Sequence, residues 1–363
     1  MGLERIVVLG LGKIGHLAAE MLAADGFVVT AVDAREKVMP RLDVFRRIDV
    51  ADDASLDRLA RDHDAFLSCL PYHLNARVAT CAHRHGIHYF DLTEDVHTTR
   101  HIRTLAVSSR GVMAPQCGLA PGFIGIVGAW LAHGFDDVRS IRLRVGALPQ
   151  HPSGLLGYAF NWSPEGVVNE YLNDCEVIEE GVRKTVSAME WIETLHIDGR
   201  RLEAFTTSGG LGTMCETFAG RVANLDYKTI RYPGHVALMN FFFHELLLRE
   251  RRDLAGEILA HAKPPVDADV VYVHAAAEGT ADGRLQRREF VRGYRPKDIA
   301  GARRTAIAWT TAGSVVAVID LVRRGTLPDR GFLKQEEIPF ENFLATDTGR
   351  LFAETAPQWP IDG

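Results

Sequence analysis

The chain has few cysteines and no excess of positive charge. Among its 363 residues there are five cysteines, and no two of them form a CxxC pair. This argues against a disulfide framework or a zinc ribbon and is typical of a reducing compartment. Lys and Arg number 41 against 47 Asp and Glu, a net charge of −6, which argues against nucleic acid as a partner.

Long apolar runs are also scarce. No charged-then-apolar leader opens the chain, and we find no apolar stretch of membrane-spanning length. The densest run, residues 239–248, is short and contains His244 and Glu245. The composition, 47% hydrophobic and 24% charged, is that of an ordinary globular protein with room for two domains. We therefore expect a soluble, cytoplasmic protein without a membrane partner.

Two groups of histidines raise the question of a metal site. They are His83, His85 and His88 near Cys81, and the pair His97 and His101. The first group straddles an expected helix end and an expected strand, which point its side chains in different directions. The second group has no third ligand close by in the sequence. The sequence therefore predicts no metal site.

The most informative segment is the glycine-rich turn after the first apolar strand. Residues 6–9 are apolar, and Gly10, Gly12 and Gly15 follow at the spacing of a dinucleotide-binding turn. The first glycine permits a tight turn, the second lets a diphosphate approach the backbone, and the third lets the next helix pack against the strand. Lys13 and Ile14 begin that helix, whose free N–H groups would bind the diphosphate.

An acidic residue, Asp33, ends the second expected strand. A carboxylate at this point accepts hydrogen bonds from the adenosine ribose hydroxyls, which favours NAD over NADP. Arg35 follows two residues later and is suited to a 2′-phosphate, so NADP stays the weaker alternative. An ordinary βαβ unit without a ligand, with Asp33 as a turn residue, is the other interpretation.

Strand and helix patterns alternate over the first 122 residues, with short links between them. This order predicts an α/β fold with a doubly wound Rossmann domain and a parallel sheet over residues 1–122. A cofactor in such a sheet lies beyond the carboxyl ends of the strands, so these ends should converge on one cleft. The further nucleotide contacts expected there are Asp49, Val50, Cys69, Leu70, Pro71, Tyr72, Leu92 and Gly118.

The pattern changes after residue 122. Residues 138–145 alternate apolar and polar, and Asp282-Gly283 lies between two further runs of this kind, as in a hairpin. We expect an inserted α+β substrate and dimerisation domain on a mostly antiparallel sheet over residues 123–304. The apolar helical pattern of residues 305–324 predicts a C-terminal segment, 305–363, that returns to the Rossmann domain.

Seven motifs spread over nearly the whole chain match a known family. They are residues 10–15, 88–92, 118–122, 158–166, 203–210, 227–235 and 330–339. On these motifs the chain resembles the saccharopine dehydrogenase family. The resemblance implies a nucleotide-binding domain interrupted by an inserted α+β domain, chemistry at a carbon–nitrogen bond of an amino acid, and a homodimer or homotetramer.

Within this family the chain is most similar to enzymes that oxidise the ε-amine of L-lysine with NAD, which releases ammonia and an aldehyde that cyclises. Such an oxidation needs a base for the amine and a carbon held against the nicotinamide. The candidate catalytic residues are Asp91, Lys228 and His235, with Glu94 as a further candidate for the base. The candidate substrate contacts are Glu94, Tyr158, Asn161, Trp162, Thr207 and Arg231.

Several of these residues also have a structural interpretation. Asp91 ends a strand and is suited to cap the following turn. Tyr158 and Trp162 suit a hydrophobic core as well as a wall beside an amine chain or a cation. Lys228 and Arg231 are three apart in an expected strand and so point to opposite faces. Arg231 suits a carboxylate clamp as well as a salt bridge.

Three functions compete at this stage. The first is NAD-dependent oxidation of a terminal amine of an amino acid such as L-lysine. The second is NADPH-dependent reductive condensation of an aldehyde with an amine, as in saccharopine reductases and carboxynorspermidine dehydrogenases, which residues 161–164 resemble. The third is a non-catalytic NAD(H) sensor. The motifs between residues 158 and 235 favour an enzyme, because a sensor does not need a substrate half.

Overall fold

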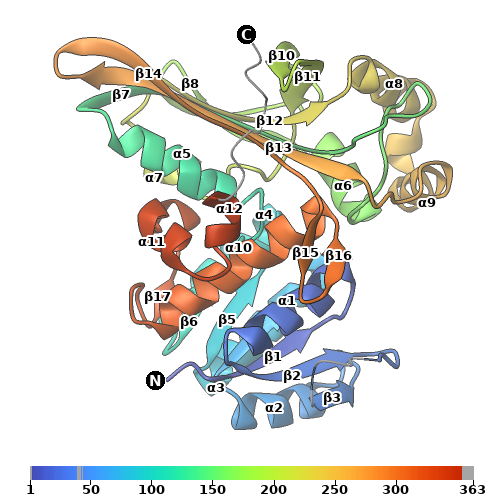
Figure 1. Cartoon of the computed structure of the whole chain (residues 1–363), viewed down its shortest axis with the longest axis vertical. Coiled ribbons are helices and arrows are strands. Elements are labelled where there is room, and N and C mark those ends of the chain that lie inside the picture. Colours follow the sequence, from blue (N-terminus) through green and yellow to red (C-terminus); the bar gives the residue numbers. More distant parts are fainter. Residues whose placement is uncertain (1, 39–41, 43, 354–363) are drawn as a thin grey trace.

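The computed structural model describes residues 2–38, 42 and 44–353 and contains two large β-sheets, one in each half of the molecule. In Figure 1 the N-terminal sheet lies at the bottom, the second sheet lies across the top, and α10 (Ala306–Arg323) runs between them. Residues 354–363 of the expected C-terminal segment lie outside the described residues.

The N-terminal sheet has seven strands in the order β17-β6-β5-β4-β1-β2-β3, and each of its pairings is parallel. The chain winds outward from β1 in both directions, so the predicted Rossmann topology is confirmed. The strands are β1 (Arg5–Leu9), β2 (Val28–Asp33), β3 (Val44–Arg47), β4 (Ala65–Ser68), β5 (His88–Asp91), β6 (Val112–Ala114) and β17 (Gly331–Phe332). The helices are α1 (Lys13–Ala24), α2 (Asp53–Asp62), α3 (Tyr72–His85) and α4 (Val96–Ala106).

The second sheet is mixed. Its main path is β10-β11-β12-β7-β13-β14, and β8 and β9 lie beside β12. β12 pairs with β7 in parallel, a pairing absent from the expectation of a mostly antiparallel sheet. The strands are β7 (Asp137–Pro149), β8 (Cys175–Glu179), β9 (Val182–Val186), β10 (Glu193–Ile197), β11 (Arg200–Thr206), β12 (Asn224–Arg231), β13 (Asp269–Ala281) and β14 (Arg284–Tyr294). The helices are α5 (Phe123–His133), α6 (Pro164–Leu172), α7 (Met214–Thr217), α8 (His235–Asn240), η1 (Phe241–Glu245), η2 (Leu248–Glu250) and α9 (Arg252–Ala262).

Helix α10 connects the two sheets. It contacts α1 on one side and β13 on the other. Asp269 of β13 accepts hydrogen bonds from the N–H groups of Ala306 at 2.6 Å and Ile307 at 2.9 Å, which satisfies the start of the helix. Beyond α10 the chain adds β17 to the edge of the N-terminal sheet. The other elements of this part are β15 (Lys297–Ile299), β16 (Ala302–Arg304), η3 (Gln335–Glu337), α11 (Phe340–Ala345) and α12 (Arg350–Ala353).

The length of the apolar run in α10 corrects one sequence expectation. By length and composition Ala306–Arg323 is able to cross a membrane, although we expected no such stretch. In the structure 83% of this stretch is buried inside the protein. A core helix passes the same test, so this single helix is weak evidence for a membrane span.

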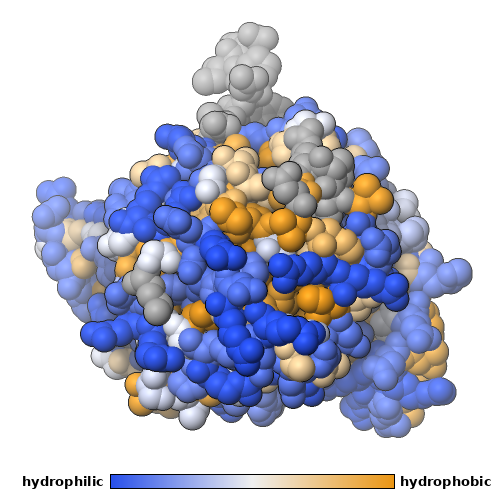
Figure 2. Space-filling view, turned by 90° about the horizontal axis from the view of Figure 1, so that it is seen from below, coloured by the Kyte–Doolittle hydropathy of each residue, from blue (hydrophilic) through white to orange (hydrophobic). Residues whose placement is uncertain are grey.

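The outer face of the N-terminal domain carries mostly hydrophilic side chains. Figure 2 views this face from below and shows hydrophobic residues mainly around its centre. α2 lies on this side and is amphipathic, with Leu56 and Leu59 buried and Arg61 exposed. Its cap is Asp52, which accepts a hydrogen bond from the N–H of Ala54 at 3.2 Å.

The glycine turn between β1 and α1 depends on the backbone conformation of Gly10 and on the close approach of Gly15 to Gly10. Gly10 has a φ of +88°, a conformation that favours glycine. A Cβ on Gly15 would lie 1.9 Å from the carbonyl oxygen of Gly10, whereas a Cβ on Gly12 would meet no atom within 4 Å. Gly15 is therefore needed for packing, and the open space at Gly12 is suited to a ligand.

We expect Gly15→Ala to lower the free energy of unfolding by about 1–3 kcal/mol or more, because the added methyl overlaps the backbone of the turn. Gly12→Ala is the matched control and should change stability little while it weakens dinucleotide binding. Urea denaturation and nucleotide titration of both variants measure the two effects. Equal stability of the two variants would contradict the close approach of α1 to β1.

Candidate active site

A cavity of about 590 Å³ lies between the two domains. The N-terminal domain lines it with the glycine turn and the segments after β4, β5 and β6, and the second domain with β7, β12, α6 and the loop before α6. The ends of these N-terminal strands therefore converge on one cleft. The sequence-selected residues that line the cavity are Gly12, Lys13, Ile14, Gly15, Cys69, Leu70, Pro71, Tyr72, Leu92, Glu94, Gly118, Asn161, Trp162 and Arg231.

Other sequence-selected residues do not line this cavity. They are Gly10, Asp33, Arg35, Asp49, Val50, Asp91, Tyr158, Thr207, Lys228 and His235. β3 ends at Arg47 rather than at residue 50, so Asp49 and Val50 lie in the turn before α2. Thr207 is buried, and its hydroxyl has no hydrogen-bond partner among the described residues.

Asp33 holds the glycine turn in place. Its Oδ2 accepts a hydrogen bond from the N–H of Leu11 and its Oδ1 one from the N–H of Arg35, both at 2.9 Å. Burial raises the pKa of Asp33, but these two N–H donors outweigh burial and keep the pKa below its usual value. The carboxylate is therefore ionised at neutral pH. The Arg35 side chain is 83% exposed, and its Nε lies 3.8 Å from Asp33 Oδ1.

Asp91 is fully buried and joins the ends of β5 and β6. Its carboxylate accepts hydrogen bonds from the Tyr89 hydroxyl at 2.7 Å and from the N–H groups of Thr93 and Gln116, each at 2.9 Å. Burial raises its pKa to about 6 despite these donors. Since its donors all come from the protein and it does not line the cavity, Asp91 fits the structural interpretation and not the role of substrate base.

β12 presents its side chains alternately to the cavity and to the opposite face of the sheet. Tyr227, Thr229 and Arg231 line the cavity. Lys228 points the other way, where its Nζ donates to Glu193 Oε2 at 2.8 Å. The period of a strand therefore brings Arg231 to the site and takes Lys228 away from it, as their spacing predicted. The catalytic role considered for Lys228 has no geometric support.

Arg231 is a buried cation at the wall of the cavity. Its Nε donates to the Tyr171 hydroxyl at 2.7 Å, and its Nη1 donates to Thr229 Oγ1 at 2.9 Å and to the Ile230 carbonyl at 2.8 Å. The Tyr158 ring lies 4.6 Å from the guanidinium carbon, so this aromatic ring contacts a cation of the protein itself. Within the described chain no carboxylate forms an ion pair with Arg231, and its Nη2 donates to no group. The guanidinium is thus free to bind a ligand carboxylate.

His235 supports Arg231 from behind through Tyr171. The His235 Nδ1 lies 3.0 Å from the Leu156 carbonyl and must donate to it, so Nε2 is the acceptor for the Tyr171 hydroxyl at 2.9 Å. Burial, followed by the nearby charge of Arg231, lowers the pKa of His235 to about 3. His235 is therefore neutral and fixes the direction of the Tyr171 hydroxyl. It is a positioning residue, because it does not line the cavity and acts on Arg231 through Tyr171.

Two carboxyl groups line the cavity with pKa values close to neutral. Burial, followed by repulsion from Glu94, raises the pKa of Glu170 to about 8. Burial is also the main cause that raises the pKa of Glu94 to about 7. No described residue donates a hydrogen bond to the Glu170 carboxylate. A pair of this kind is suited to take up and release protons at physiological pH.

Glu170 is the site residue that the sequence interpretation missed. It lies on α6 between Val167 and Tyr171, both buried, and is itself only 6% exposed. The available signal was an acidic residue on the apolar face of a short helix, directly after the motif of residues 158–166. Such a charge is rarely buried without a functional reason.

The remaining aromatic and amide side chains build the wall of the cavity. Trp162 Nε1 donates to the Tyr158 hydroxyl at 3.2 Å. The amide of Asn161 binds both backbone groups of Val266, with Nδ2 donating to the carbonyl at 3.0 Å and Oδ1 accepting from the N–H at 2.8 Å. The Asn161 amide is therefore occupied, and its contribution is to shape the loop.

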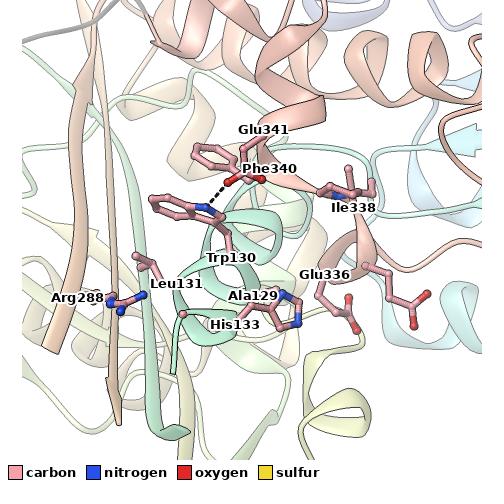
Figure 3. Close-up of a pocket in the computed structure, with 12 residues that line it drawn as sticks. Ala129, Trp130, Leu131, His133, Arg288, Glu336, Ile338, Phe340 and Glu341 are labelled. Atoms are coloured by element: carbon pink, nitrogen blue, oxygen red, sulfur yellow. Dashed lines mark hydrogen bonds between the residues drawn. The ribbon is translucent and has the colours of Figure 1, made fainter. Parts of the chain in front are cut away.

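A second cavity, of about 430 Å³, lies beside α5 and α11 (Figure 3). Trp130 Nε1 donates to Glu341 Oε1 at 2.7 Å, and the Trp130 and Phe340 rings pack together. Glu336 accepts hydrogen bonds from the hydroxyls of Thr213 and Thr217. The carboxylates of Glu336 and Glu341 are thus engaged by neighbouring groups, and this second cavity lacks the glycine turn. The first cavity is therefore the better candidate for catalysis.

The fold and the first cavity define a class of protein: a Rossmann nucleotide-binding domain joined to a mixed-sheet domain, with the site between them. Residues 6–113 match the family model for the saccharopine dehydrogenase NADP binding domain, and residues 118–346 match the saccharopine dehydrogenase C-terminal domain. The chain belongs to the saccharopine dehydrogenase family.

Curated relatives include the saccharopine dehydrogenases (NADP(+), L-glutamate-forming) of Schizosaccharomyces pombe and Saccharomyces cerevisiae. The first is 23% identical over 202 residues, which is 52% of this chain and 45% of the relative, and the second is 24% identical over 206 residues, 53% and 46%. The chain thus spans about half the length of the curated relatives it matches.

Solved structures resemble this chain over more of its length. Apo histidine-tagged saccharopine dehydrogenase (L-Glu forming) from S. cerevisiae has a TM-score of 0.70 at 18% identity and covers 92% of this chain and 94% of its own. An engineered D-amino acid dehydrogenase bound to NADP+ has a TM-score of 0.51 at 14% identity, with 98% and 100% covered. At these identities the likeness concerns the fold alone.

We expect Tyr171→Phe to lower the free energy of unfolding by about 1–3 kcal/mol, because it leaves Arg231 Nε and His235 Nε2 buried without their partner. The matched control is Tyr272→Phe, since the buried Tyr272 hydroxyl has no hydrogen-bond partner in the described structure. The control should be neutral or stabilising in urea denaturation. A destabilisation of the control equal to that of Tyr171→Phe would contradict the hydrogen-bond chain.

Proposed function

We propose that this chain is an amino-acid dehydrogenase of the lysine 6-dehydrogenase type, which uses NAD to oxidise a terminal amine and releases ammonia. The observation that carries the proposal is one cavity that joins a dinucleotide-binding turn to Arg231, Glu94 and Glu170. A bound nicotinamide supplies the hydride acceptor. From the family resemblance we also propose a cytoplasmic homodimer or homotetramer that acts on a free amino acid.

The charges of the cavity favour a substrate with one carboxylate and more than one amine. Among the described residues that line it, the cationic side chains are Lys13, at the diphosphate turn, and Arg231. The acidic side chains are Glu94, Glu165 and Glu170. L-Lysine, with one carboxylate and two ammonium groups, complements this set. Saccharopine carries three carboxylates, whereas Arg231 is the cationic side chain that lines the cavity away from the diphosphate turn.

Glu170 is the best candidate for the base. The amine must lose a proton before hydride leaves its carbon, because an ammonium has no lone pair for the new C=N bond. Ionised Glu170 accepts this proton, and Glu94 accepts a proton from the water that adds to the imine carbon. Protonated Glu170 then returns its proton to the nitrogen of this carbinolamine, the hydroxyl group loses its proton to solvent as the C=O bond forms, and the C–N bond breaks to release ammonia and the aldehyde. Arg231 holds the substrate carboxylate and so fixes which carbon faces the nicotinamide.

The choice of nucleotide rests on two neighbouring residues. The ionised Asp33 at the end of β2 favours the two ribose hydroxyls of NAD. The exposed Arg35 and the NADP named for the family model and the curated relatives favour NADP. We propose NAD, because a 2′-phosphate would have to lie beside the Asp33 carboxylate.

A second candidate function is NADPH-dependent reductive condensation of an aldehyde with an amine. It is supported by the activity for which the curated relatives are named and by residues 161–164. A non-catalytic NAD(H) sensor is less well supported, because it gives no reason for a buried acid pair beside a free guanidinium.

The proposal is tested by mixing the purified chain with NAD or NADP and single amines, and by following the absorbance of the reduced nicotinamide. We expect reduction with L-lysine and NAD. Reduction only with saccharopine and NADP would favour the second function, and binding without reduction across the amine panel would favour a sensor.

Two substitutions in the same assay identify the nucleotide contact. We expect Asp33→Ala to raise the KM for NAD far more than that for NADP, and Arg35→Ala to leave the KM for NAD unchanged. If Arg35→Ala raised the KM for NADP while Asp33→Ala had no effect on NAD, the preference would be reversed.

The wild-type rate of oxidation should increase as the pH rises to about 8, because the ionised form of Glu170 is the base. Glu170→Gln should lower kcat by about 10²–10⁴-fold and remove this dependence. The control is Glu165→Gln, since Glu165 is an exposed residue at the same cavity. An unchanged pH–rate profile in Glu170→Gln would rule out this base.

A further inference from the structure

The outer helices of the N-terminal domain bring three potential metal ligands together. Cys81 and His85 lie four residues apart on α3 and therefore on one face of the helix. Asp57 approaches them from α2. Their ligand atoms, Sγ, Nε2 and a carboxylate oxygen, all lie within 4.8 Å of one another. This group is separate from the cavity described above.

One contact inside this group already has the length expected between two ligands of a single cation, and the others are close to it. Asp57 Oδ1 lies 3.4 Å from Cys81 Sγ and 2.9 Å from His85 Nε2. Ligands bound to one zinc at about 2.0–2.3 Å in tetrahedral geometry are separated by roughly 3.3–3.6 Å. Small side-chain movements are therefore enough to admit a cation between the three atoms.

Access and charge also suit a divalent cation. Cys81 is buried, whereas the side chains of His85 and Asp57 are 19% and 28% exposed, so a cation can enter from solvent. Asp57 is an acidic residue whose Oδ1 faces both Cys81 Sγ and His85 Nε2, so its carboxylate lies at the centre of the group.

We propose that Asp57, Cys81 and His85 bind a zinc-type divalent cation through one oxygen, one sulfur and one nitrogen atom, with a fourth position open to water. Binding releases the thiol proton to solvent, and the thiolate and carboxylate then balance the two positive charges. His85 coordinates through Nε2 as a neutral ring and carries its proton on Nδ1. Arg84, which pairs with Asp57 and is 55% exposed, turns toward solvent. The sequence analysis considered His85 beside Cys81 but predicted no metal site, because the third ligand, Asp57, lies 24 residues before Cys81 on another helix.

The site would tie α2 to α3. The first turn of α3, at Tyr72 and Asn75, lines the active-site cavity, so the cation would stiffen the helix that begins there. Because the cation binds the folded state, the melting temperature should rise with metal concentration.

The test is a titration of the full chain with Co²⁺ alone, followed by the near-ultraviolet thiolate-to-cobalt absorption band, and then displacement of the cobalt by Zn²⁺. In the wild type we expect the band to saturate at one equivalent of Co²⁺ per chain. We expect no band in Cys81→Ser and at least tenfold weaker Co²⁺ binding in His85→Gln. The matched control is His101→Gln, an exposed histidine on α4 outside the group, which should bind as the wild type does.

Melting curves without metal show whether each variant is folded, and His85 is partly exposed, so His85→Gln keeps the test valid if Cys81→Ser does not fold. Added Zn²⁺ should raise the melting temperature of the wild type and of His101→Gln, but not of His85→Gln. Absence of the band in the wild type, a band that persists in Cys81→Ser, or equal binding by His85→Gln and His101→Gln would overturn the proposal.

Discussion

The site depends on a buried guanidinium that is stabilised without an ion pair to any residue that the structure describes. Arg231 has its charge compensated by a tyrosine oxygen, a threonine oxygen, a backbone carbonyl and the face of Tyr158. A buried cation of this kind is costly to desolvate, and it attracts an anion from the one direction that the protein leaves open. The nearby acids respond to the same burial, since Glu170 stays protonated at a higher pH than an exposed glutamic acid.

The two domains contribute different parts of this site. The N-terminal sheet brings strand ends and a glycine turn to one edge, as parallel topology requires. The second sheet contributes β12, whose alternate residues form a polar strip of Tyr227, Thr229 and Arg231 along the opposite wall. The acid pair comes from both domains, with Glu94 after β5 and Glu170 on α6. The site is therefore complete only when the domains are packed together.

Local patterns allowed most of the fold to be predicted from the sequence. The glycine turn, the alternation of strands and helices, the apolar helix of residues 305–324 and the hairpin at Asp282-Gly283 are all determined by neighbours in the chain. The parallel pairing of β7 with β12 was not predictable, because residues such as Ser140 and Asn224 meet across a long stretch of sequence.

In the candidate site, too, local patterns were predictable from the sequence and contacts between distant segments were not. Strand alternation separated Lys228 from Arg231 correctly, because it is a local property. The buried state of His235 and Asp91 depends on what other segments cover them, so their hydrogen bonds to Leu156 and Gln116 had no signal in the sequence. Residue type alone suggested proton transfer for both, whereas their surroundings assign them to support. Glu170 was missed for the converse reason: its neighbours looked like an ordinary helix core.

The position of α10 has a consequence for how this architecture can be divided. The helix begins on Asp269 of the second sheet, runs past α1, and leads into the strand that completes the first sheet. A fragment that stops before residue 306 would keep the second sheet and lose β17 from the edge of the first, and it would leave a long apolar groove between the two sheets open to water. The nucleotide-binding half is complete only with α10 and β17, which follow the second domain in the chain. A separately expressed N-terminal half would therefore lack part of its own packing.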